Sequence, residues 1–77
     1  MGRLYFPCSH ARGTLIDRHG TAIADLAEAR DYATSIVHSL LMTRSSEDRR
    51  SWVLHVLDDG GDEVLVMPFT YVIGPPH

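Results

Sequence analysis

The chain has 77 residues and a formal net charge of −3 at neutral pH, and all seven of its basic residues are arginine. A chain of this length supports one domain built from two layers of secondary structure. Its apolar fraction of 44% argues against a disordered chain, and its acidic balance argues against the positive surface with which proteins bind a phosphate backbone.

The first third of the sequence predicts short extended segments. Residues 4–8 form an apolar run with two aromatic side chains, which indicates a strand. Pro7 has no N–H to donate, so we expect this strand at a sheet edge or with a bulge. Residues 14–17 predict a second strand, and a turn at residues 19–20 precedes a short extended piece that ends at Ile23.

The middle of the chain predicts one amphipathic helix over Leu26–Met42. Asp25 is a typical N-cap, and Glu28 stands three residues later, where a capping box places its acidic residue. Apolar residues then recur at spacings of three and four, which puts them on one helical face. This stripe consists of Leu26, Ala29, Ala33, Ile36, Val37, Leu40 and Leu41. Residues 43–50 are polar without such a period and predict a loop.

The last third of the chain predicts a hairpin. Residues 52–57 and 63–67 have strand composition, and the acidic, glycine-containing segment 58–62 between them has the residues of a tight turn. Pro68 interrupts the second strand, and the β-prone run 69–73 predicts an additional C-terminal strand.

These elements in the order ββαββ predict a two-layer α+β fold. We expect a four-stranded, mainly antiparallel sheet with the single amphipathic helix on one face. No change in composition marks a boundary, so residues 1–77 are expected to form one small domain.

Several short motifs punctuate this pattern: Arg3-Leu4-Tyr5-Phe6, Ile16-Asp17-Arg18-His19-Gly20, Asp25-Leu26, Ala29-Arg30 with Ala33, Asp58-Asp59 with Gly61, and Pro68-Phe69. In these motifs the chain resembles an uncharacterised family of short proteins from rhizobia and related alphaproteobacteria, a domain of unknown function. The resemblance extends over residues 3–69. It implies the ββαββ fold and implies no activity.

The single cysteine bears on where the protein works. Cys8 has no partner for an intrachain disulfide, and small secreted domains usually depend on disulfides. The N-terminal apolar run is too short for a signal peptide, and no stretch approaches the ~18 apolar residues of a membrane span. We therefore expect a cytoplasmic protein.

Metal binding has two candidate segments. Cys8 and His10 stand two residues apart, with His19 across the predicted hairpin, but one such pair is half of a zinc site. The acidic run 58–62 contains calcium-binding residue types, yet an EF-hand loop is longer and lies between helices. A buried cysteine, loop histidines and a hairpin turn are the favoured interpretations, so no metal or cofactor is expected.

Catalysis and RNA binding are also weakly indicated. Cys8 is a candidate nucleophile with any of five histidines, but no elbow motif presents it, so we do not expect an enzyme. The arginines Arg30, Arg44, Arg49 and Arg50, with Trp52 or Tyr5 as a stacking platform, would suit RNA. Glu47 and Asp48 interrupt this cluster, and a solvated loop of mixed charge is favoured.

The strongest functional signal is the composition of the last two strands. Residues 52–57 and 64–67 are apolar at nearly every position, as in sheets that are covered on both faces. One helix covers only one face, so the other is expected to meet a second copy, the chain's own C-terminal segment, or another protein. Trp52 is either a core residue or an interface anchor.

We therefore predict a non-enzymatic interaction module that forms a homodimer through its sheet. The candidate interface residues are Trp52, Leu65, Met67, Phe69, Tyr71 and Ile73. An alternative is an antitoxin of the HicB type, a partner of a small toxic ribonuclease, because a hairpin leading into a capped helix resembles the partial ribonuclease-H-like fold of those proteins. A small RNA-binding domain is the less favoured third hypothesis.

Overall fold

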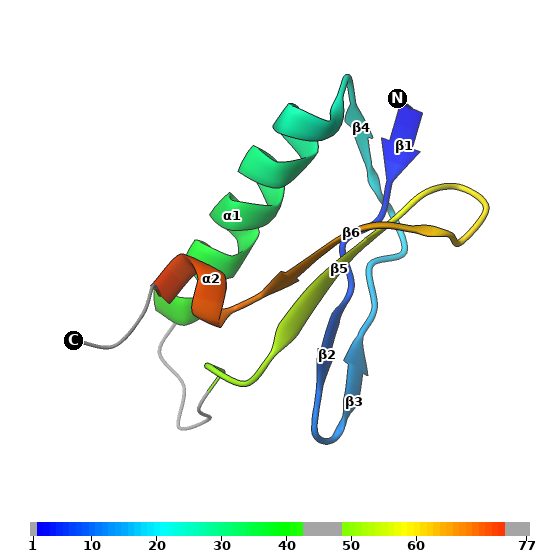
Figure 1. Ribbon diagram of the computed structural model, residues 1–77. Coiled ribbons are helices and arrows are strands. Elements are labelled where there is room, and N and C mark those ends of the chain that lie inside the picture. Colours follow the sequence, from blue (N-terminus) through cyan, green and yellow to red (C-terminus); the bar gives the residue numbers. More distant parts are fainter. Residues whose placement is uncertain (1, 43–48, 74–77) are drawn as a thin grey trace.

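The computed structural model describes residues 2–42 and 49–73, which form six strands and two helices (Figure 1). The strands are β1 (Gly2–Leu4), β2 (Cys8–His10), β3 (Gly13–Leu15), β4 (Thr21–Ile23), β5 (Val53–Leu57) and β6 (Glu63–Pro68). The helices are α1 (Leu26–Met42) and α2 (Thr70–Ile73). No helix in this part of the chain is long and apolar enough to cross a membrane.

The main sheet has four antiparallel strands in the order β3-β2-β5-β6, and β1 pairs with β4 in a separate two-stranded sheet. The predicted α+β class, with a four-stranded antiparallel sheet and one long helix, is confirmed. The detailed ββαββ arrangement is only partly matched, because the N-terminal region contains four short strands where two and an extended piece were expected.

Pro7 explains why the first expected strand is divided. Leu4 pairs with Thr21 in the small sheet, whereas Cys8 pairs with both Leu15 and Leu54 in the main sheet. Between Leu4 and Cys8 the chain stays extended beside β5. Pro7 has no backbone N–H to donate, so it only accepts a hydrogen bond, from the N–H of His55 to its carbonyl at 2.8 Å. The ladder is therefore interrupted at the proline, and one extended segment serves two sheets.

The long helix has the predicted bounds. The Asp25 side chain caps it, since its Oδ1 accepts the backbone N–H of Glu28 at 2.8 Å. Ala29, Ala33 and Val37 are completely buried against the sheet, so small side chains let the helix axis approach the strands closely. Leu26, the first residue of the predicted stripe, is 48% exposed and lies outside the contact.

We expect Asp25→Ala to lower the free energy of unfolding by about 1 kcal/mol, because it removes the acceptor for an otherwise unpaired N–H at the helix start. Asp25→Ser keeps an oxygen at this position and serves as the matched control, with stability close to that of the wild type. Urea denaturation of the three proteins measures the difference. Equal stability of the alanine variant would contradict the role of the cap.

The C-terminal run forms a helix and not the expected strand. Phe69 is fully buried, its N–H donates to the carbonyl of Trp52 at 3.0 Å, and its carbonyl accepts from the N–H of Val72 at 3.1 Å. This anchor turns the chain into α2, which packs beside α1 (Figure 1). Both helices therefore lie on one side of the main sheet, and α2 does not cover the other side.

Candidate interaction face

Among residues 2–42 and 49–73, no helix or strand packs over the side of the main sheet opposite α1. Along β5, Leu54 and Val56 are fully buried under the helix, while Val53, His55 and Leu57 alternate with them and are only half-buried. Cross-strand partners in a sheet share a face, so the register extends this surface to the neighbouring strands. We call it the open face; it consists of Tyr5, Ser9, Thr14, Val53, His55, Leu57 and Val66.

His55 lies at the centre of the open face and is bonded on both ring nitrogens. Its Nε2 lies 2.9 Å from the Ser9 hydroxyl oxygen, and its Nδ1 lies 2.8 Å from Oε2 of Glu63. In the tautomer that carries hydrogen on Nδ1, the ring donates to the carboxylate and accepts from the hydroxyl. The sequence does not signal this cluster, because Ser9 and His55 are 46 residues apart and only the strand register joins them.

Ser9, His55 and Glu63 contact one another in the same sequence as the residues of a serine–histidine–acid catalytic triad. The backbone position that would present the serine as a nucleophile is different. Ser9 lies within β2, paired with Val53 of β5 and Thr14 of β3, and not on a sharp turn at a strand end. The arrangement instead holds the imidazole against the sheet and satisfies its polar atoms on a largely apolar surface.

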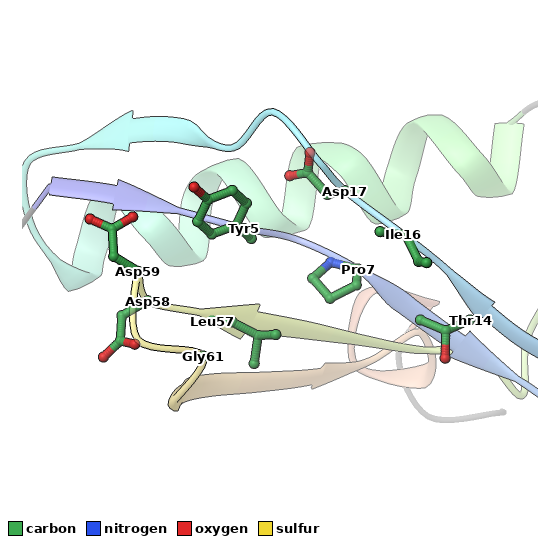
Figure 2. A pocket seen from close by; sticks show the side chains of 9 residues that line it. All are labelled: Tyr5, Pro7, Thr14, Ile16, Asp17, Leu57, Asp58, Asp59 and Gly61. Carbon is green, nitrogen blue, oxygen red and sulfur yellow. The ribbon is translucent and has the colours of Figure 1, made fainter.

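A groove of about 410 Å³ continues the open face toward the β5–β6 turn (Figure 2). It is lined by Tyr5, Pro7, Thr14, Ile16, Asp17, Leu57, Asp58, Asp59 and Gly61. In Figure 2 α1 lies behind the strands, so the groove opens away from the helix. Its floor is apolar and one end is acidic, which suits an extended side chain with an aliphatic stem and a positive end.

Asp17, beside this groove, organises the turn between β3 and β4. Its carboxylate accepts three backbone N–H groups, from Phe6 at 3.0 Å and from His19 and Gly20 at 3.1 Å. Partial burial acts to raise the pKa of Asp17, but the N–H groups of Gly20, Phe6 and His19 and the nearby His19 ring outweigh it and hold the pKa below its ordinary value. The carboxylate therefore stays charged and acts as a structural clamp.

Gly20 is required at the end of this turn. Its φ is +71°, and a Cβ atom there would lie 2.7 Å from Cγ of Arg3 and 2.9 Å from a ring carbon of Tyr5. A side chain would therefore both strain the backbone and collide with β1 and the residue after it.

The candidate metal ligands do not come together. Cys8 is buried, and burial raises the pKa of its thiol to about 11, which makes it a poor nucleophile or ligand. His10 stacks on Trp52 with ring centroids 4.5 Å apart, while His19 belongs to the Asp17 turn. Within residues 2–42 and 49–73, no three histidine, cysteine, aspartate or glutamate side chains are grouped as metal ligands would be.

The acidic segment between β5 and β6 is the predicted hairpin turn. Oδ1 of Asp58 accepts the N–H groups of Gly60 and Asp62, both at 2.9 Å. Gly61 adopts a φ of 85°, as turns of this kind require. The Asp58 carboxylate therefore stabilises the turn through hydrogen bonds within the turn itself.

The predicted interface residues are mostly core. Trp52, Met67 and Phe69 are 8%, 6% and 0% exposed, and Leu65 packs against the same core. These side chains point toward α1, so the apolar strands present their other side to solvent. Tyr71 is exposed on α2, on the helix side of the sheet, and the side chain of Ile73 lies outside what the structure describes.

The arginine cluster is partly built into the fold. The guanidinium of Arg49 donates to the carbonyl of Leu40 at 2.7 Å and lies 5.1 Å from the ring centroid of Trp52. It therefore fastens the end of α1 to the core. Arg30 is exposed on α1, and Arg44 falls among residues 43–48, outside the described part of the chain.

Comparison with known proteins agrees with one part of the resemblance noted from the motifs, the membership of a domain family of unknown function. No curated protein and no solved structure matches the chain. The sequence profile of a domain of unknown function (DUF6894) matches residues 3–70, nearly the whole chain. The description of that family assigns no function. Because it spans both sheets and α1, the chain belongs to the DUF6894 family.

Proposed function

We propose that this domain is a non-enzymatic interaction module that binds a second copy of itself through the open face. The proposal rests on one observation: helices cover only one side of the main sheet. Both α1 and α2 pack on one side, while Val53, Leu57 and Val66 stand on the other, with Val66 39% exposed. An apolar sheet face without a covering layer is a typical protein-binding surface.

A second copy is the simplest partner for this surface. A two-fold axis brings the same patch of each chain together, so no additional complementary surface is needed. The polar centre of the open face is compatible with burial, because the His55 ring bonds to Ser9 on one side and to the neighbouring Glu63 on the other. The proposed interface therefore lies on the face of the sheet that carries Val53 and Val66, and not on the face of Trp52 and Phe69 that was expected from the sequence.

Sedimentation equilibrium of the untagged protein at micromolar concentration tests the proposal. We expect a mass near twice the 8.6 kDa of one chain. Val66→Arg places a charge on the open face and should produce monomers. Tyr71→Arg is the matched control, since Tyr71 is more exposed but lies on the helix side, and this variant should remain dimeric.

The outcome that contradicts the proposal is a wild-type protein that sediments as a monomer. A thermal melt of both variants separates loss of the dimer from loss of the fold. If Tyr71→Arg alone abolishes the dimer, the partner binds on the helix side instead.

The alternatives rest on other measurements. The commitment of Arg49 to α1 and Trp52 weakens the RNA-binding hypothesis. The antitoxin hypothesis stays a prediction. A gene for a very small basic protein next to the gene for this chain would favour it. A cytoplasmic location and an alphaproteobacterial source are parts of the same proposal, and the genomic context of the coding sequence tests the source.

A further inference from the structure

The groove beside the β5–β6 turn combines an apolar floor with negative charge at one end. Tyr5, Pro7 and Leu57 form the floor, and Asp58 and Asp59 lie at the end nearest the turn (Figure 2). Its volume of about 410 Å³ lies within the range of roughly 300–1,000 Å³ that is typical of binding pockets. The groove is therefore large enough to hold a long side chain together with a neighbouring one.

Asp59 is the carboxylate of this groove that is open to a ligand. The carboxylate of Asp17 accepts three backbone N–H groups, and Oδ1 of Asp58 accepts two. Asp59 is exposed at the rim, and within residues 2–42 and 49–73 no hydrogen bond or ion pair engages its side chain. The groove therefore places a free negative charge beside apolar carbon.

The charge around the groove favours a cation. The carboxylates at this end of the sheet are Asp17, Asp58, Asp59, Asp62 and Glu63, and the guanidiniums are those of Arg3 and Arg18. Five negative and two positive groups leave a net charge of −3. A positively charged group gains attraction on approach to this end, whereas an anion is repelled.

We infer that the groove binds an extended, arginine-containing segment of another protein. The arginine side chain lies across Tyr5 and Leu57 with its guanidinium beside Asp59, and a neighbouring apolar residue of the segment packs on Ile16, which is 63% exposed. Arginine suits the groove because its aliphatic stem packs on apolar surface, while its planar head stacks on an aromatic ring and bonds to a carboxylate. The inference goes beyond the proposed dimer and does not depend on it.

A second copy of the chain is a poor source of this arginine. Most of the described arginines already take part in interactions, namely Arg3, Arg12, Arg49 and Arg50. Arg30 lies on α1, on the other side of the sheet. Arg18 lies at the acidic end itself, so bringing it to the groove of a second copy would also bring two acidic ends together. The segment is therefore expected from a different, basic partner.

A short synthetic peptide in which arginine and valine alternate is the probe for this site. Fluorescence anisotropy of the labelled peptide with the full-length protein gives the dissociation constant, and amide chemical shifts in NMR spectra give the position. We expect saturable binding with the largest shifts at Thr14, Leu57 and Gly61, which line the groove. The same peptide with citrulline in place of arginine keeps its shape and loses its charge, so it should bind about tenfold more weakly or worse.

Two matched pairs of variants test the two parts of the groove. Asp59→Asn should raise the dissociation constant by about threefold or more, whereas Asp62→Asn, in the same turn but outside the groove, should change it by less than about twofold. Ile16→Ser should weaken binding by about threefold or more through lost apolar contact. Leu15→Ser is its control, because Leu15 is also exposed but does not line the groove.

Equal weakening by Asp59→Asn and Asp62→Asn would show that only net charge attracts the peptide and would overturn the inferred site. So would shifts confined to residues outside the groove, or equal binding of the citrulline peptide. Because a second copy on the open face would cover Tyr5 and Leu57, binding is also measured with Val66→Arg, whose substitution lies outside the groove. Absence of binding to both proteins refutes the groove, whereas a monomeric wild type in sedimentation refutes only the proposed dimer.

Discussion

Replacing Phe69 by alanine is expected to lower the free energy of unfolding by about 3–5 kcal/mol, because a fully buried aromatic side chain leaves a cavity that the core cannot fill. Phe69 packs on Trp52 with ring centroids 5.9 Å apart and joins β6 to α2. A domain of this length has roughly 4–12 kcal/mol of stability, so the variant should be partly or wholly unfolded at 37 °C. Urea denaturation followed by far-ultraviolet circular dichroism measures the loss.

Tyr71→Ala is the control for this substitution. Tyr71 is two residues further on but is 74% exposed, so its truncation should change stability by less than about 0.5 kcal/mol. If the two alanine variants were equally stable, Phe69 would not be part of the core. Both residues stand in one apolar run of the sequence, and only the structure separates them.

The same contrast shows what the sequence could and could not predict about the interface. The composition of β5 and β6 indicates that both faces of the sheet are apolar, and this holds for Val53 and Val66 as well as for Leu54 and Met67. With apolar residues on both faces and His55 as the single polar residue within β5, strand alternation does not by itself identify the face that the helix covers. That choice depends on the register between α1 and the sheet, which is a tertiary property.

Secondary-structure elements were predictable where they depend on residues that are close together in the sequence. Asp25 and the apolar period gave the bounds of α1, and the acidic turn gave the β5–β6 hairpin. The C-terminal run was predicted wrongly, because its β-branched composition is overruled by the burial of Phe69. The contacts of His55 were not predictable, since they join three strands that are distant in the chain.

The motif from Ile16 to Gly20, which carried part of the family resemblance, has a physical explanation in the structure. Asp17 gathers three N–H groups, one of them from Phe6 on the other side of the turn. Gly20 allows the positive φ and the close approach of Arg3 and Tyr5. The spacing of aspartate and glycine therefore fixes the crossing between the two sheets, which also shapes one end of the groove.

We expect Asp17→Ala to lower the free energy of unfolding by about 1–3 kcal/mol at neutral pH, because three backbone donors lose a charged acceptor. The sign of its pH dependence follows from the lowered pKa of Asp17 in the folded state. The stabilisation is fully present above the pKa of the unfolded chain, about 3.9, and is lost as the pH falls through the lower folded value. The difference between wild type and variant should thus be constant from pH 7 to about pH 5 and shrink below about pH 4.

Asp17→Asn separates the charge from the shape of the side chain. The amide keeps one oxygen that accepts a backbone N–H, so its loss of stability should be smaller than that of the alanine variant, and its stability should lack the Asp17 titration. Chemical denaturation of the three proteins at pH 7, 5 and 3 measures both effects, and all three are compared at one protein concentration because the proposed dimer would make stability depend on concentration. A difference between wild type and Asp17→Ala that is as large at pH 3 as at pH 7 would show that the carboxylate clamps the turn without its charge. In that case the hydrogen-bond geometry alone would hold the two sheets together at this crossing.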